Sequence, residues 1–90
     1  MDMKYITYDN GMYHDIVIFS SSTSHQEMVI NLSIKEEDLL GAGFISMEDG
    51  KFYCHGESTT LGLQARPNDS KIINKFMKLE RPTLLNNPGI

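Results

Sequence analysis

The chain has little of what usually marks a membrane-bound or disulfide-bonded protein. Its 90 residues contain a single cysteine, Cys54, so no internal disulfide can form and a reducing cytoplasm is the expected compartment. The longest apolar run is Ile16 to Phe19, which is far too short to cross a bilayer. The first ten residues also lack a long apolar run, so we expect neither a signal peptide nor a membrane anchor.

The chain also lacks a large excess of charge of one sign. The formal net charge is −4, and the acidic and basic residues are dispersed along the chain. A protein that binds the phosphate backbone of a nucleic acid needs a clustered basic face, so we expect no nucleic-acid partner. The hydrophobic content of 40% is that of a folded domain. We expect one domain over residues 1–79, followed by an extended C-terminal tail over residues 80–90.

The usual catalytic and metal-binding patterns are missing as well. There is no glycine-rich phosphate loop. His14, His25, Cys54 and His55 match no zinc spacing, and the adjacent Cys54 and His55 would point to opposite faces of a strand. The acidic run at residues 36–38 is typical of a solvated helix start. The sequence therefore predicts no enzyme, no metal and no cofactor.

What is present is a repeated hairpin pattern. Strands are predicted at residues 4–8 and 12–19, on either side of Asp9-Asn10-Gly11, because Asn-Gly favours a tight hairpin turn. A second pair is predicted at residues 44–48 and 51–55, around Asp49-Gly50. The two hairpins align at an offset of 39 residues, through either a repeat or the convergence of two hairpins on the same residues.

Each hairpin is followed by a helical pattern. Ser24 and Glu27 form a capping box for the first helix, and Asn68 or Asp69 can cap the second. Between the two halves, residues 34–43 predict one helical turn that ends at Gly41. The fold class is therefore α+β in the order ββαββα, with a four-stranded, mainly antiparallel sheet and the helices on one face.

Pairing across the predicted turns sorts the strand residues into two faces. Partners add up to 21 in the first hairpin and to 99 in the second, which places Ile45, Met47, Phe52 and Cys54 on one core face, with Cys54 as a buried thiol. The opposite face would expose Tyr5, His14, Ile16, Ile18, Phe44, Tyr53 and His55. Such a patch predicts a partner interface, most simply a homodimer, unless the tail or a strand covers it or the hairpins do not share a sheet.

The loop from residue 56 to residue 67 is the one candidate ligand site. Glu57, Ser58, Thr59 and Arg66 could hold an anion beside the N-terminus of the second helix. The alternative is structural: Glu57 pairs with Arg66 to close the loop, and Ser58 and Thr59 satisfy backbone groups.

The same loop carries a resemblance. The run Gly-Glu-Ser-x-x-Leu-Gly-Leu-x-x-Arg-Pro at residues 56–67 resembles a group of small, uncharacterised proteins encoded in phages and prophages. The similarity covers mainly residues 42–73. It implies a phage-derived accessory protein in the cytoplasm of a bacterial host, and it carries no assigned activity.

Two hypotheses follow for the function. The first is a non-enzymatic accessory protein that acts by binding, as a host-takeover or anti-defence inhibitor of a host protein. The second is a protein that sequesters a small anionic, nucleotide-like ligand, with the site at a dimer interface. An enzyme would need a convergent acid, base or metal, which the sequence does not offer.

Overall fold

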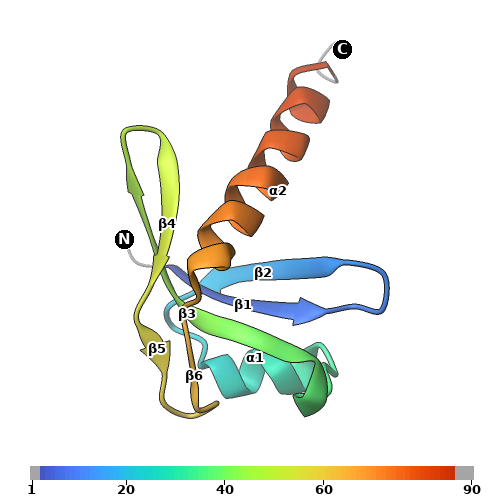
Figure 1. The fold of residues 1–90 in the computed structure, drawn as a ribbon, viewed down its shortest axis with the longest axis vertical. Helices are drawn as coiled ribbons and strands as arrows, with labels where there is room; N and C mark the ends of the chain where they lie inside the picture. Colours follow the sequence, from blue (N-terminus) through green and yellow to red (C-terminus); the bar gives the residue numbers. More distant parts are fainter. Residues whose placement is uncertain (1–2, 87–90) are drawn as a thin grey trace.

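The structure is a computed structural model that describes residues 3–86 and the side chains of residues 3–77. Six strands, two α-helices and a short 3₁₀ turn follow one another along this part of the chain (Figure 1). Their bounds are β1 Met3–Asp9, β2 His14–Ser20, α1 His25–Asn31, the 3₁₀ turn η1 Glu36–Asp38, β3 Leu39–Glu48, β4 Lys51–His55, β5 Glu57–Ser58, β6 Leu63–Gln64 and α2 Pro67–Asn86. The fold is α+β, as predicted, but a small β5–β6 pair precedes the second helix.

The main sheet has four antiparallel strands in the order β2-β1-β3-β4. The second hairpin has the predicted register, with Ile45 opposite Cys54. In the first, Ile6 lies opposite Val17 and not Asp15, because the turn is a four-residue loop in which Asn10 accepts hydrogen bonds from the amides of Met12 and Tyr13. Since this shift is two residues, every side chain keeps its predicted face.

The segment before the second hairpin differs from the prediction. Only Glu36–Asp38 forms a helical turn, and β3 begins at Leu39. Gly41 therefore does not end a helix. It is buried within β3 and lies opposite Thr7 of β1.

The pairing of β1 with β3 decides which residues share a face. Met3 lies opposite Ile45, and Tyr5 lies opposite Gly43. Because side chains alternate along a strand, Tyr5 projects from the same face as Ile45, whereas Ile6 projects from the other. The predicted grouping of Tyr5 with Phe44 is wrong, because the register between β1 and β3 places these two side chains on opposite faces of the sheet.

The two helices cover opposite faces of the sheet, not one face as predicted (Figure 1). On one face Ile73 of α2 packs against Tyr5, Ile16 and Ile45. On the other, Met28 and Val29 of α1, together with Leu61 and Leu63 near β5 and β6, pack against Ile6, Phe19 and Ala42. Both faces are apolar, so each requires a cover to remove it from water.

The predicted capping box of α1 is confirmed. The Ser24 hydroxyl accepts the amide of Glu27 at 3.0 Å, and the Glu27 carboxylate accepts the amide of Ser24 at 3.1 Å. These backbone and side-chain bonds to Ser24 favour the ionised carboxylate and lower the pKa of Glu27. The box places the N-cap at Ser24, directly before the buried His25, which is the first residue of α1.

The second helix is longer than the sequence suggests. It runs from Pro67 to Asn86, so residues 80–86 are helical where an extended tail is predicted, and residues 87–90 lie outside the described part. From its first turns on the sheet, α2 rises away from the strands (Figure 1). No helix in residues 3–86 combines the length and the apolar character needed to cross a membrane.

Candidate functional site

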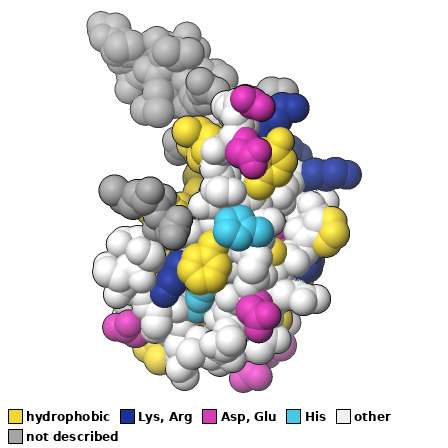
Figure 2. All heavy atoms as spheres, turned by 90° about the vertical axis from the view of Figure 1, so that its left-hand side faces the viewer, with side chains coloured by type: hydrophobic (Ala, Val, Ile, Leu, Met, Phe, Trp, Pro, Cys, Tyr) yellow, Lys and Arg dark blue, Asp and Glu magenta, His cyan; other side chains and the backbone are white. Residues whose placement is uncertain are grey.

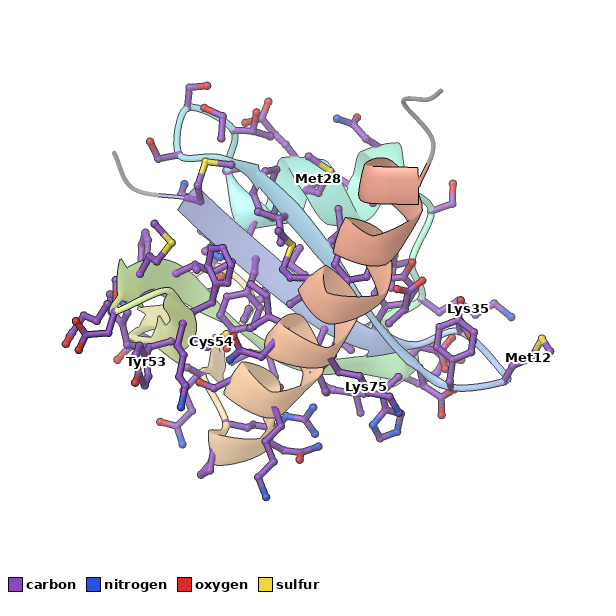
Figure 3. The ribbon with its side chains drawn as sticks, turned by 90° about the horizontal axis from the view of Figure 1, so that it is seen from above. Met12, Met28, Lys35, Tyr53, Cys54 and Lys75 are labelled. Carbon is purple, nitrogen blue, oxygen red and sulfur yellow. The ribbon has the colours of Figure 1, made fainter. Side chains whose placement is uncertain are left out.

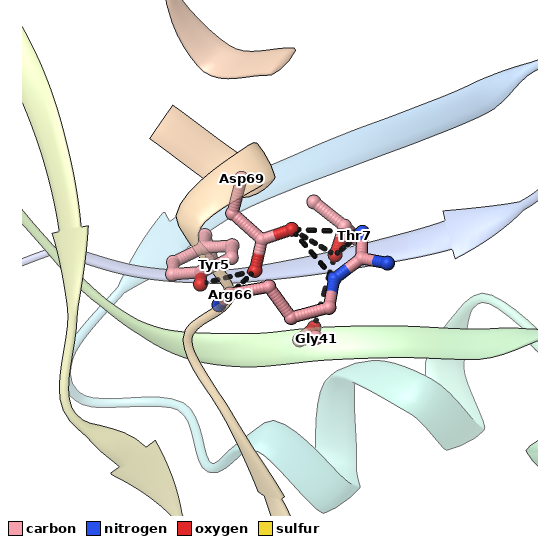
Figure 4. Close-up of polar contacts among 5 residues, drawn as sticks. All are labelled: Tyr5, Thr7, Gly41, Arg66 and Asp69. Carbon is pink, nitrogen blue, oxygen red and sulfur yellow. Dashed lines mark hydrogen bonds and ion pairs between the residues drawn. The ribbon is translucent and has the colours of Figure 1, made fainter. Parts of the chain in front are cut away.

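The N-terminus of α2 is held in the sheet by a buried carboxylate. Asp69 is fully buried, and its two oxygens accept hydrogen bonds from five donors (Figure 4). Arg66 supplies three of them: its amide at 2.9 Å, Nε at 3.0 Å and Nη2 at 2.9 Å. Arg66 directly precedes Pro67, the first helical residue, so Asp69 also satisfies one of the free amides at the helix start.

The other two donors come from β1. The Tyr5 hydroxyl donates to Asp69 at 2.6 Å, and the Thr7 hydroxyl donates at 3.1 Å. Both side chains are fully buried, and no buried side-chain polar atom among the described residues lacks a partner. Burial, reinforced by the carboxylate of Asp69, raises the pKa of Tyr5 far above its ordinary value, so the hydroxyl stays protonated and donates.

Gly41 makes room for this cluster. A Cβ at this position would overlap the Asp69 carboxylate and would lie 3.0 Å from Thr7 Oγ1 and 3.1 Å from Arg66 Nε. The glycine in β3 is thus required by the close approach of the buried ion pair.

The structure does not bring the four predicted ligand residues together. Arg66 is paired with Asp69, three residues ahead, and not with Glu57. Ser58 is buried, and its hydroxyl accepts the amide of Leu61 at 3.3 Å, which matches the structural alternative for this residue. Glu57 and Thr59 are exposed. The loop is closed by the β5–β6 pair, with Ser58 opposite Leu63.

Sequence reasoning missed the role of Asp69 as the centre of a cluster. The Arg-Pro-x-Asp spacing at residues 66–69 was available as a signal, because a carboxylate at the third helical position can reach back to the residue before the helix. Nothing in the sequence indicates that Tyr5 and Thr7, more than 60 residues earlier, supply the other donors.

The seven predicted interface residues are also divided between two faces. Tyr5 and Ile16 are buried beneath α2, Ile18 is half-buried beside them, and His14 is exposed at the start of β2. Phe44, Tyr53 and His55 project from the other face by their register. The predicted common face therefore does not exist.

Phe44 belongs instead to an aromatic cluster at the β3–β4 side of the sheet, in which it stacks on His55 and meets His25 edge-to-face. The centroid of its ring lies 6.3 Å from that of His55 and 5.9 Å from that of the buried His25. The His25 ring in turn has a centroid distance of 5.5 Å to the ring of Phe19. Figure 2 shows this side of the molecule, where histidine lies next to a hydrophobic side chain on the surface. His25 Nε2 lies 3.0 Å from the carbonyl oxygen of Gly43, and burial lowers the pKa of the imidazole.

Among the side chains of residues 3–77, the groups with chemical reactivity are not arranged around a common centre. Cys54 is half-buried against the α2-side core, and burial raises the pKa of its thiol to about 11. His55 points to the other face of β4. Among the residues whose side chains are described, no three histidine, cysteine or acidic residues gather where they could hold a metal ion.

Two open grooves run along the sides of α2. The first, which we call the β4 groove, has a volume of about 570 Å³ and is lined by Gly50, Lys51, Phe52, Tyr53, Ser70, Lys71, Asn74, Lys75 and Met77. The second, the β2 groove, has a volume of about 440 Å³ and is lined by Tyr13, His14, Asp15, Ile16, Asn68, Ile72, Lys75 and Phe76. Lys75 borders both, and Figure 3 shows its side chain on the opposite side of α2 from Tyr53.

The rims of these grooves carry exposed aromatic side chains. Tyr13 is 60% exposed and Phe76 is 37% exposed beside the β2 groove. Tyr53, a lining residue of the β4 groove whose side chain projects from the other face of β4, is 44% exposed. Exposed rings next to hollowed surface are typical of binding surfaces. Comparison of the chain with protein-family models, with curated proteins and with solved structures finds no match.

Proposed function

We propose that the protein is a non-enzymatic binding protein, a phage-derived accessory protein that inhibits a host protein in the bacterial cytoplasm. The observation that carries this proposal is the pair of grooves along α2 with exposed rings at their rims. Aromatic side chains are enriched in protein interfaces and supply much of their binding energy. A helix that stands on a sheet with a groove on each side can present several such rings to one partner.

The state of the reactive groups supports binding over catalysis. The carboxylate of Asp69 is saturated with donors, and the raised pKa of Cys54 disfavours the nucleophilic thiolate at neutral pH. An enzyme would instead need titratable groups that converge on a cleft.

The phage context rests on the motif at residues 56–67. Within it, Ser58 and Arg66 make fold-closing contacts. The motif therefore favours a shared fold with the phage and prophage group, and the binding function is argued from the grooves.

The proposal is tested by purifying a tagged protein from host cells and recording native mass spectra. A host protein should co-purify in a defined stoichiometry, and Phe76→Glu, which places a charge at the β2 groove, should abolish its retention. Ile30→Glu is the matched control, because Ile30 is 68% exposed on α1, away from α2. Equal retention by both variants, each shown to be folded by circular dichroism, contradicts the proposal.

A second candidate is the binding of a small anionic, nucleotide-like ligand, and the β4 groove favours it. Three of the eight cationic residues of the chain, Lys51, Lys71 and Lys75, line this groove, although the net charge is −4. The only ion pair among the described side chains is that of Arg66 with Asp69, so the three ammonium groups have no carboxylate partner there. An anion would be attracted to such a groove.

This candidate makes a different prediction from the first. Native spectra would show a retained small mass, released on denaturation, and Lys71→Glu would remove it. The exposed Lys35, which lies outside the β4 groove, provides the control variant Lys35→Glu. Loss of the small mass from both variants, or from neither, contradicts the assignment to this groove.

A further inference from the structure

The two edges of the main sheet differ in whether other parts of the chain bond their outward-facing backbone groups. At the β4 edge, side chains of α2 satisfy the outward-facing backbone groups: Asn74 accepts the amide of Phe52 at 3.1 Å and donates to its carbonyl oxygen at 2.8 Å, and Ser70 accepts the amide of Cys54 at 2.9 Å. This edge is covered by a helix, one of the ways in which proteins prevent edge-to-edge pairing.

Within residues 3–86, and among the side chains of residues 3–77, nothing covers the β2 edge in this way. Along an antiparallel strand, the backbone groups of successive residues point alternately to one neighbouring strand and to the other. The groups of Phe52 and Cys54 point outward from β4. The registers of the sheet therefore place those of Ile16, Ile18 and Ser20 outward from β2. The strand is a regular run of seven residues, His-Asp-Ile-Val-Ile-Phe-Ser, without lysine, proline or a bulge. Its one acidic residue, Asp15, lies near the start of the strand, so residues 16–20 lack the features that usually protect an exposed edge.

Two local contacts bracket the open part of this edge. The amide of Ile16 donates to the carboxylate of Asp15 at 2.8 Å, and the carbonyl oxygen of Ser20 accepts the amide of Thr23 at 3.1 Å. Among the described residues, the outward amides of Ile18 and Ser20 and the outward carbonyl oxygens of Ile16 and Ile18 have no hydrogen-bond partner. These groups form a short segment centred on Ile18.

The geometry points to a second copy of this chain as the occupant, paired antiparallel through β2 with Ile18 opposite Ile18 of the other copy. In this register the Ile18 amide of each copy donates to the Ile18 carbonyl oxygen of the other. The Ser20 amide of each donates to the Ile16 carbonyl oxygen of the other. The Ile16 amide of one copy would face the Ser20 carbonyl oxygen of the other. Each of these groups keeps its partner within its own chain, which is the Asp15 carboxylate for the amide and the Thr23 amide for the carbonyl oxygen. The open segment is thus complementary to itself about a two-fold axis.

The side chains at this edge agree with the same register. Val17 and Ile18 are apolar and only half-buried, one on each face of the sheet. A strand added beside them would bury both, and the result is one continuous eight-stranded sheet. This inference goes beyond the proposed function, because it concerns the outward backbone groups of β2, although β2 also contributes residues to the β2 groove.

The test compares two substitutions at residue 18 by native mass spectrometry and sedimentation over a range of concentrations. Wild-type protein should form a dimer. Ile18→Pro removes the outward amide but no bond to β1, so it should yield a folded monomer. Ile18→Thr keeps the amide and the β-branched shape, and should still dimerise. A monomeric wild type, or a folded proline variant that remains dimeric, overturns the inference.

Hydrogen exchange on the wild-type protein keeps the test independent of how the proline variant folds. The Ile18 amide should be protected in concentrated solution and lose at least tenfold in protection on dilution to the monomer. The Phe52 amide, which Asn74 covers within the chain, should exchange at one rate throughout. Equally fast exchange of Ile18 at every concentration overturns the pairing, and protection only after addition of host extract assigns the edge to a host strand instead.

Discussion

The Tyr5 hydroxyl donates a 2.6 Å hydrogen bond to the carboxylate of Asp69, and this contact joins the first strand to the start of the last helix. Both residues are fully buried, and they are separated by 64 residues of sequence. The contact fixes where α2 stands on the sheet, and hence where the two grooves beside α2 lie.

Replacing the carboxylate should therefore destabilise the whole domain. Asp69→Asn keeps the size of the side chain but leaves the guanidinium of Arg66 without its counter-ion, and the loss of one partner of a buried pair is costly. We expect a decrease of about 3 kcal/mol in the free energy of unfolding, measured by urea denaturation. Glu57→Gln, at the exposed position that the sequence offers as an alternative partner of Arg66, should change the free energy of unfolding by less than about 0.5 kcal/mol. Equal effects would contradict the assignment of the ion pair.

Gly41→Ala tests the close approach of the cluster to β3. The added methyl group would meet Asp69, Thr7 and Arg66, so we expect a loss of about 1–3 kcal/mol through overpacking. Gly62→Ala is the control for backbone strain alone, because Gly62 has a φ of +69° and no neighbour within 4 Å of the added atom. The double variant of Gly41→Ala with Asp69→Ala should recover part of the loss. Purely additive losses in denaturation would show that the clash with the carboxylate is not the cause.

The thiol of Cys54 should react slowly in the folded protein. Its pKa of about 11 leaves little thiolate at pH 8, whereas an ordinary thiol is partly ionised there. We expect alkylation by iodoacetamide at least about a hundredfold slower than in urea-unfolded protein. The rate is followed by intact-mass spectrometry. A folded rate within a few-fold of the unfolded one would contradict the raised pKa.

His25 should make the domain less stable in mild acid. Burial lowers its pKa in the folded state below the unfolded value of about 6.5, so the unfolded chain binds the proton more readily. Stability is then complete above about pH 6.5, begins to fall as the pH drops below that value, and stops falling once the folded pKa has been passed.

The measurement is the urea midpoint as a function of pH for wild type and for His25→Gln, whose amide can still donate to the carbonyl oxygen of Gly43. The variant should lose this part of the pH dependence. His14→Gln, at an exposed position, should keep it. A wild-type midpoint that is flat between pH 7.5 and pH 5 would argue against a buried neutral imidazole.

Much of the local structure follows from nearby residues. The capping box of Ser24 and Glu27, the Asp49-Gly50 turn and the pairing of Ile45 with Cys54 are all predicted, because each depends on contacts within one turn or one hairpin. The predicted loop of the first hairpin is two residues too short, because Asn10 accepts both the Met12 and the Tyr13 amide and so stabilises a wider loop.

What only the tertiary structure decided is how distant segments meet. The pairing of Tyr5 with Gly43 sets the phase between the two hairpins, and a change of phase by one residue moves every side chain to the other face. For this reason Tyr5 and Ile16, predicted to be exposed, lie in the core. Arg66, predicted to bind a ligand, instead pairs with Asp69, and the fold brings the hydroxyls of Tyr5 and Thr7 to the same carboxylate. The sequence by itself determined the hairpins, the first helix and its cap, because local hydrogen bonds specify them. The site was decided by long-range packing, in which a buried charge must find its donors wherever the fold brings them.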